Sequence, residues 1–173
     1  MNKQLLFDFV ANKQDNTVTV TREFAAPLTL VWDAWTRSEL LDQWWAPHPY
    51  KVRTKTMDFR EGGHWLYAMI SPEGEAHWCR ADYQQIKHKA AFTCTDAFCD
   101  EEGNINTAFP RAKWNNQFKE GGDSTTVHIT IQYDSLADLE KIIEMGFKEG
   151  FTMGLNQLDT LLQQITQSQP NTK

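Results

Sequence analysis

Apolar side chains at helical spacing near the C-terminus predict the longest helix of the chain. From Phe147 onward, apolar residues recur every three or four positions, which is the spacing that lines one face of an α-helix. The polar residues between them fall on the opposite face. We therefore predict an amphipathic helix of about five turns over residues 147–165. Its apolar face carries Phe147, Phe151, Leu155, Leu158, Leu162 and Ile165.

A break separates this helix from a shorter one before it. Ser135 followed by Asp138 is the pattern of a capping box, and Gly146 is placed to end the short helix in a left-handed conformation. A single helix over residues 136–166 would be roughly 45 Å long, whereas a compact chain of this size has a diameter of about 40 Å. We therefore expect a short helix over residues 135–145, a break at Gly146, and the long helix after it.

Two glycines interrupt the long helix on or next to its apolar face. Gly150 and Gly154 lie one turn apart, and each costs roughly 1 kcal/mol of helix propensity relative to alanine. Something must offset that cost. Either the helix approaches a sheet closely at these positions, or the glycines leave room for a ligand beside Phe151.

The first fifty residues predict a hairpin followed by two short helices. Two β-rich runs, residues 5–10 and 17–24, are separated by five polar residues. Pro27 suits the first turn of a helix, and apolar residues follow it at helical spacing. Ser38 is placed to cap a second short helix, which Pro47 and Pro49 end. These helices are too short to form a layer, so we expect them to close one end of a sheet.

Between residues 50 and 134 the pattern is that of strands, with turn residues between the runs and no helical periodicity. The one long polar connection, residues 101–110, is a candidate mobile loop or lid. We predict an antiparallel meander with strands at residues 51–59, 64–70, 75–86, 90–98, 113–119 and 125–133.

One hairpin of the meander decides which aromatic side chains share a face. If Pro72 and Glu73 form the whole loop, Trp65 lies opposite Arg80. A bulge in this turn would shift one strand by one residue and break the assignment. With the two-residue loop, the concave face of the sheet carries Trp65, Tyr67, Met69, Trp78 and Arg80.

Several stretches resemble one known family. They are REFAAP at residues 22–27, VWDAWT at 31–36, WWAP at 44–47, DFREGG at 58–63 and GFKEG at 146–150. The chain resembles the START-like (SRPBCC) superfamily from residue 17 to about 162, and within it the bacterial proteins similar to the activator of the heat-shock-protein-ninety ATPase.

The resemblance implies an α+β, birch-pollen-allergen-like helix-grip fold, in which a curved antiparallel sheet wraps around the long C-terminal helix. We expect a single domain over residues 1–173. Residues 1–16 would be an N-terminal extension or edge hairpin, residues 17–166 the core, and residues 167–173 a tail.

Composition narrows the class of partner. The 173-residue chain carries a formal net charge of −6 without a basic stripe, which argues against binding nucleic acid or an anionic membrane. We see no signal-peptide pattern and no apolar stretch near the roughly 18 residues that span a bilayer. The three cysteines show no C-x-x-C spacing, so neither a disulfide framework nor a thiolate zinc site is expected. We expect a cytoplasmic protein with neutral, cationic or apolar partners.

The sequence shows no pattern of a catalytic, metal or cofactor site. In the predicted register His64 and His77 share a face but lie about 13 Å apart, beyond the reach of one zinc ion. Nucleophile and phosphate-loop motifs are missing from the sequence. Arg80 is the most informative polar residue: it either binds an acidic ligand group or stacks on a ring, or else pairs with Asp82 or another carboxylate at the rim.

Seven tryptophans and ten phenylalanines need a large concave surface to line. The resemblance implies an apolar ligand held between sheet and long helix, so we expect a carrier or sensor of a small apolar or aromatic molecule. The alternatives are a co-chaperone domain that binds a chaperone in a stress response, and a cyclase- or hydrolase-like enzyme. The expected ligand-binding residues are Trp35, Trp65, Tyr67, Trp78, Arg80, Phe92, Trp114, Phe147, Phe151 and Gly154, the last favoured as facing the cavity because the resemblance puts the ligand beside this helix.

Overall fold

The computed structural model describes residues 5–168, and this part of the chain forms eight strands and four helices. The strands are β1 (Phe7–Asn12), β2 (Thr17–Phe24), β3 (Lys51–Met57), β4 (His64–Ile70), β5 (Ala76–Lys87), β6 (Ala91–Phe98), β7 (Ala112–Gly121) and β8 (Ser124–Tyr133). The helices are α1 (Leu28–Thr36), α2 (Ser38–Trp44), α3 (Leu136–Glu144) and α4 (Phe147–Ser168).

All the strands belong to one antiparallel sheet with the order β1-β2-β8-β7-β6-β5-β4-β3. After β2 the chain passes through α1 and α2 to the far edge of the sheet, and then returns strand by strand until β8 pairs with β2. Register shifts in β3 and β5 bend the sheet, because an extra residue in one strand increases the local twist. The predicted α+β helix-grip architecture is confirmed.

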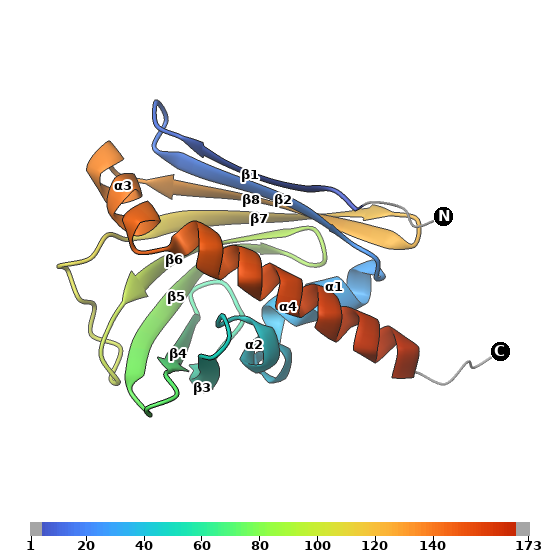
Figure 1. Ribbon diagram of the computed structural model, residues 1–173, viewed down its shortest axis with the longest axis horizontal. Coiled ribbons are helices and arrows are strands. Elements are labelled where there is room, and N and C mark those ends of the chain that lie inside the picture. The colour runs from blue at the N-terminus through green and yellow to red at the C-terminus, as the bar shows by residue number, and fades with distance from the viewer. Residues whose placement is uncertain (1–4, 169–173) are drawn as a thin grey trace.

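The long helix α4 runs across the concave side of this sheet, with α1 and α2 toward one end of it and α3 at the other (Figure 1). The predicted break before it is confirmed: Ser135 Oγ accepts a hydrogen bond from the Asp138 N–H at the start of α3, and Gly146 has a φ of 90°. No helix within residues 5–168 has the length and apolar character to cross a membrane. Most of the predicted tail, at residues 169–173, lies outside the described residues, as do residues 1–4.

The turn between β4 and β5 differs from the predicted one and changes the faces of these strands. Ser71 N donates to Glu75 O at 2.9 Å, Gly74 N donates to Ser71 O at 2.9 Å, and Gly74 has a φ of 91°. The loop therefore has three residues, with glycine in the left-handed conformation that such loops require. Trp65 pairs with Ala81 and not with Arg80, so the predicted register is wrong by one residue.

This shift moves two predicted ligand-binding residues, Trp78 and Arg80, to the convex face of the sheet. They pair with Ala68 and Leu66, which point away from α4. Their places on the concave face are taken by the smaller residues Cys79 and Ala81, both buried. The same register places His64 and His77 on opposite faces, which corrects the expectation that they share one.

The start of α2 also differs from its prediction. Arg37, in an extended conformation, occupies the N-cap position, and no side chain caps the helix. Ser38 is the first helical residue, and its hydroxyl contacts the carboxylate of Glu39 at 3.4 Å. Ser38 therefore does not satisfy a backbone N–H of the first turn.

The close approach that Gly154 allows is to α2. A Cβ atom at Gly154 would lie 3.4 Å from both Trp44 O and Trp45 O. Gln157, one turn further on, donates from Nε2 to Trp44 O at 3.0 Å and to Ala46 O at 2.8 Å. Helix α4 thus rests on the C-terminal end of α2, and Gly154 faces neither the sheet nor a cavity, contrary to both predictions for it.

Candidate functional site

A cavity of about 290 Å³ lies between the concave face of the sheet and the first turns of α4. Strands β4 to β7 supply one wall, and α4 with the end of α2 supplies the other. Seven of the ten predicted ligand-binding residues line it, whereas Trp78, Arg80 and Gly154 do not. The seven are Trp35, Trp65, Tyr67, Phe92, Trp114, Phe147 and Phe151.

Aromatic rings form the wall of the cavity beside α4. Phe147 and Phe151, one turn apart on the helix, are stacked with their centroids 5.3 Å apart. Trp114 of β7 meets both rings edge-on, at centroid distances of 6.0 and 5.6 Å. These edge-to-face arrangements suit the charge distribution of aromatic rings. They hold the wall in one arrangement without filling the space in front of it.

The polar atoms of two aromatic residues on β4 are bonded to the protein. Trp65 and Tyr67 are stacked with their centroids 3.9 Å apart. The Tyr67 hydroxyl accepts a hydrogen bond from Trp45 Nε1 at 3.0 Å, and Trp65 Nε1 donates to Thr54 Oγ1 at 2.9 Å. Burial raises the pKa of Tyr67 well above its ordinary value, so this phenol is neutral. The rings therefore present mainly apolar surface.

The cavity opens near the junction of α3 and α4. Met145, which lines it, is 51% exposed, and Gly146 and Pro110 beside it are half-buried. The loop at residues 101–110, predicted as a candidate lid, borders this opening through Pro110. Its neighbour Ala108 accepts a hydrogen bond from Lys141 Nζ of α3 at 3.0 Å. Loop and helix together thus form the rim of the opening.

Asp96 of β6 is a half-buried carboxylate among the mainly apolar residues that line this cavity. It accepts hydrogen bonds from Trp114 Nε1 at 2.7 Å and from the Ala112 N–H at 2.8 Å. Burial raises the pKa of Asp96 to about 6, although these two donors and the charge of Arg111 oppose the increase. Asp96 was not among the predicted site residues, even though it lies four residues after Phe92 in a predicted strand and therefore on the same face.

Two thiols also line the cavity. Burial raises the pKa of Cys79 to about 12 and holds that of Cys94 well above its ordinary value. Both are therefore protonated at neutral pH and contribute apolar surface, since the thiolate is the reactive form. Within residues 5–168, no group of three or more His, Cys, Asp or Glu side chains is placed to hold a metal ion.

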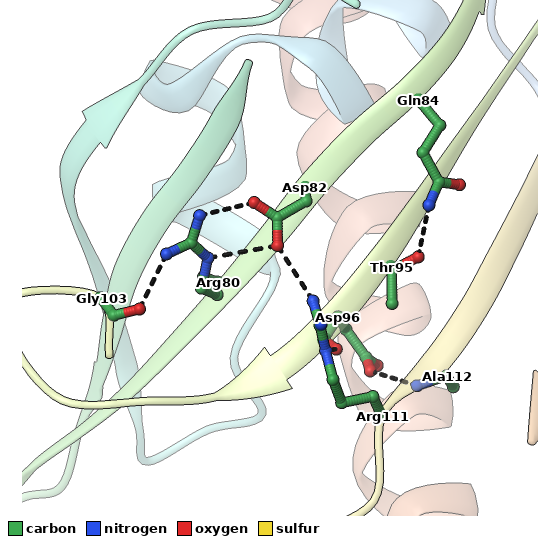
Figure 2. Close-up of polar contacts among 8 residues, drawn as sticks. All are labelled: Arg80, Asp82, Gln84, Thr95, Asp96, Gly103, Arg111 and Ala112. Atoms are coloured by element: carbon green, nitrogen blue, oxygen red, sulfur yellow. Dashed lines mark hydrogen bonds and ion pairs between the residues drawn. The ribbon is translucent and has the colours of Figure 1, made fainter. Parts of the chain in front are cut away.

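Arg80 lies on the convex face and joins a network that holds the 101–110 loop (Figure 2). It pairs with Asp82 and donates from Nη1 to Gly103 O at 2.7 Å. Arg111 also pairs with Asp82, at 3.0 Å, and donates from Nε to the backbone carbonyl of Asp96 at 2.9 Å. Of the interpretations left open for Arg80, pairing with Asp82 is thus confirmed.

Comparison with known families agrees with this geometry. The model of the family "Activator of Hsp90 ATPase homolog 1-like protein" matches residues 25–163, which is most of the chain and includes the walls of the cavity. The chain belongs to this family. The predicted START-like resemblance is therefore confirmed.

Solved structures of similar chains show the same fold. Protein Ms6760 from Mycobacterium smegmatis is 30% identical, with 92% of this chain and 97% of that chain covered and a TM-score of 0.83. A protein from Staphylococcus epidermidis is 29% identical over 95% and 98% of the two chains, with a TM-score of 0.79. One from Arthrobacter aurescens, 23% identical over 91% of each chain, has a TM-score of 0.86. Among curated proteins, none is a significant match.

Proposed function

We propose that this member of the family binds a small apolar or aromatic molecule in the cavity beside α4, and acts as a carrier or sensor. The observation that carries the proposal is the cavity itself: about 290 Å³, walled by aromatic rings and open at one end. Ligand sites are typically concave, mostly apolar and largely preformed, with a few polar groups that fix orientation. This cavity has that composition.

The polar groups of the cavity favour binding over catalysis. Asp96 is the carboxylate among the lining residues, and each of its oxygens already accepts a hydrogen bond from the protein. No histidine is among the lining residues, and the two thiols are protonated. An acid–base mechanism needs a second positioned group to receive or supply the proton. A cyclase- or hydrolase-like activity is therefore the weaker proposal.

The family match alone supports the alternative function, a co-chaperone interaction. The family description names an activator of the Hsp90 ATPase, and a cytoplasmic stress-response role would accompany that function. Such a protein would need a chaperone-binding surface but no ligand in the cavity. The two proposals are therefore separated by whether the cavity binds a small molecule at stoichiometric levels.

A binding titration tests the carrier proposal. The neutral probe N-phenyl-1-naphthylamine should bind at a single saturable site and quench tryptophan emission, because several indole rings line the cavity. Gly150→Leu places a side chain at the cavity wall and should weaken binding at least tenfold. Met153→Leu, on the exposed side of the same helix, is the matched control and should bind like the wild type. Absence of saturable binding would defeat the carrier proposal and favour the co-chaperone one.

A further inference from the structure

Two residues that line the cavity each carry a buried polar atom with no partner in the described part of the chain. Within residues 5–168, Trp35 Nε1 and Asn116 Oδ1 make no hydrogen bond, although the two side chains belong to residues only 3% and 2% exposed. Both residues line the cavity. Buried polar groups are nearly always paired, because an unpaired one loses its hydrogen bonds to water without replacement. Two such atoms on one cavity therefore indicate the chemistry of its occupant.

Trp35 belongs to α1, and Asn116 lies on β7, a strand that contacts α1. Asn116 faces inward on β7 between Trp114 and Phe118. The ring of Trp35, on α1, packs edge-on against Phe118 with a centroid distance of 5.7 Å. Since α1 and α3 lie toward opposite ends of α4 (Figure 1), α1 is remote from the opening at Met145.

The orientation of the Asn116 amide is set by the protein. Its Nδ2 donates to the carbonyl of Phe92 at 3.3 Å, on the paired strand β6. This bond directs the nitrogen to the strand and leaves Oδ1 as the atom that needs a donor. The indole N–H of Trp35 can only donate. The two lining residues therefore supply one acceptor and one donor that the described part of the chain leaves unpaired.

A hydroxyl group complements this pair, because it donates through its hydrogen and accepts through its lone pairs. We propose that the ligand of this cavity is a phenol or an alcohol whose hydroxyl is bound by Asn116 and Trp35. This inference rests on the proposed ligand-binding function and narrows it. A purely apolar ligand would leave both atoms unpaired, so the site should discriminate against it.

Asp96 does not fill the same role. Its two carboxylate oxygens accept from Trp114 Nε1 and from the Ala112 N–H, so its hydrogen-bonding needs are met by the protein. By contrast, Asn116 Oδ1 and Trp35 Nε1 have no hydrogen-bond partner among the described residues. A water molecule is the other possible occupant, but a buried water is typically held by about three polar groups, and the rings of Phe92 and Phe118 lie beside these residues.

Three probes of similar size separate the two hydrogen bonds. 2-Naphthol donates and accepts, 2-methoxynaphthalene only accepts, and 2-methylnaphthalene does neither. Equilibrium dialysis of the full chain at neutral pH measures each dissociation constant directly. We expect 2-naphthol to bind about tenfold more tightly than 2-methylnaphthalene, with 2-methoxynaphthalene between them. This order is opposite to the order of hydrophobicity.

Substitutions assign the discrimination to the two residues. Asn116→Leu keeps the volume and removes the acceptor, so the preference for 2-naphthol over 2-methoxynaphthalene should disappear. Trp35→Phe removes the indole N–H and should abolish the preference for 2-methoxynaphthalene over 2-methylnaphthalene. Asn115→Leu, on the convex face of β7, is the matched control and should keep all the wild-type ratios. Either of the first two variants suffices if the other fails to fold.

The outcomes separate this inference from the proposed function. If none of the three probes binds saturably, the ligand-binding function itself is wrong. If all three bind with equal affinity, or if the ratios survive in the Asn116 and Trp35 variants, the cavity binds ligands but the hydroxyl inference is overturned. The hydroxyl inference is supported if the Asn116 and Trp35 variants each lose the affinity ratio assigned to that residue, and the Asn115 control keeps the wild-type ratios.

Discussion

The two parts of the continuous helix α4 pack against different surroundings. Its N-terminal part, residues 147–151, lines the cavity through Phe147, Gly150 and Phe151. In its C-terminal part, residues 154–162, Leu155 and Leu158 are completely buried in the closed core and the cavity does not reach them. One apolar stripe can therefore be core along one stretch and ligand wall along the next.

The difference arises from what each part faces. In the C-terminal part, the missing side chain of Gly154 and the hydrogen bonds of Gln157 bring α4 against the end of α2. In the N-terminal part, the nearest atom to a Cβ at Gly150 would be Pro47 Cγ at 3.6 Å, an ordinary contact. The helix is thus fixed at one part, and the curved sheet remains separated from it at the other.

The largest expected difference between the two parts is in stability. Leu158→Ala removes a fully buried side chain and should lower the free energy of unfolding by about 2 to 5 kcal/mol, because a new cavity forms in packed core. Phe147→Ala only enlarges an existing cavity at half-buried Phe147, and should cost clearly less while weakening probe binding. Urea denaturation measures both. Equal losses of stability would mean that the cavity part is packed as tightly as the core part.

The next largest effect is a dependence of stability on pH, which arises from Asp96 in the cavity. Burial raises the pKa of Asp96 from its ordinary value of 3.8 to about 6, so the folded protein holds this proton more tightly than the unfolded chain does. Between about pH 4 and pH 6 this group therefore makes the protein less stable as pH rises, by roughly 3 kcal/mol in total, and it adds no further change above pH 6.

Asp96→Asn should remove that component, because the amide stays neutral throughout. Urea denaturation at several pH values would show the wild type losing stability relative to this variant between about pH 4 and 6. Asp123→Asn, in the exposed turn after β7, is the control and should keep the wild-type slope. A wild-type slope in Asp96→Asn would show that Asp96 ionises as an exposed carboxylate does.

A pair of glycine substitutions measures the same contrast on a smaller scale. A Cβ at Gly154 would already contact the carbonyls of Trp44 and Trp45 at 3.4 Å, so the further atoms of the side chain in Gly154→Leu should overpack this contact and destabilise the protein by about 2 kcal/mol. Gly150→Leu extends along the cavity, gains helix propensity of somewhat under 1 kcal/mol, and should keep its stability. Denaturation of the two variants measures both changes in stability. If Gly154→Leu is as stable as the wild type, α4 is not fixed by α2 at this position.

Local signals predicted most of the fold. The period of the apolar residues after Phe147, the cap at Ser135 and the left-handed Gly146 all depend on neighbours within one or two turns, and each is found in the structure. The aromatic wall followed from the same periodicity together with the family resemblance. Sequence patterns are informative at this range because helix phase and turn conformation are set locally.

The errors arose where geometry between distant segments decides the outcome. The turn that ends at Gly74 has one residue more than predicted. This residue exchanges the faces of Trp78 and Cys79, because side chains alternate with a period of two along a strand. The contact of Gly154 with α2 joins segments over a hundred residues apart. The polar atoms of Asp96 and Asn116 gain their significance from burial, which the sequence of their strands does not reveal.

The smallest expected effect is at Arg80, where the register was wrong. Arg80→Leu removes the ion pair with Asp82 and the hydrogen bond to Gly103 O on the convex face. Because these groups are partly exposed, the loss of stability should be about 1 kcal/mol or less. Probe affinity should stay within about twofold of the wild type, since the guanidinium does not reach the cavity. Trp65→Leu, on the cavity side of the adjacent strand, should weaken binding in the same titration. If Arg80→Leu lost affinity strongly and Trp65→Leu did not, the turn between β4 and β5 would have to be the two-residue turn. The cavity wall would then lie on the opposite face of β5.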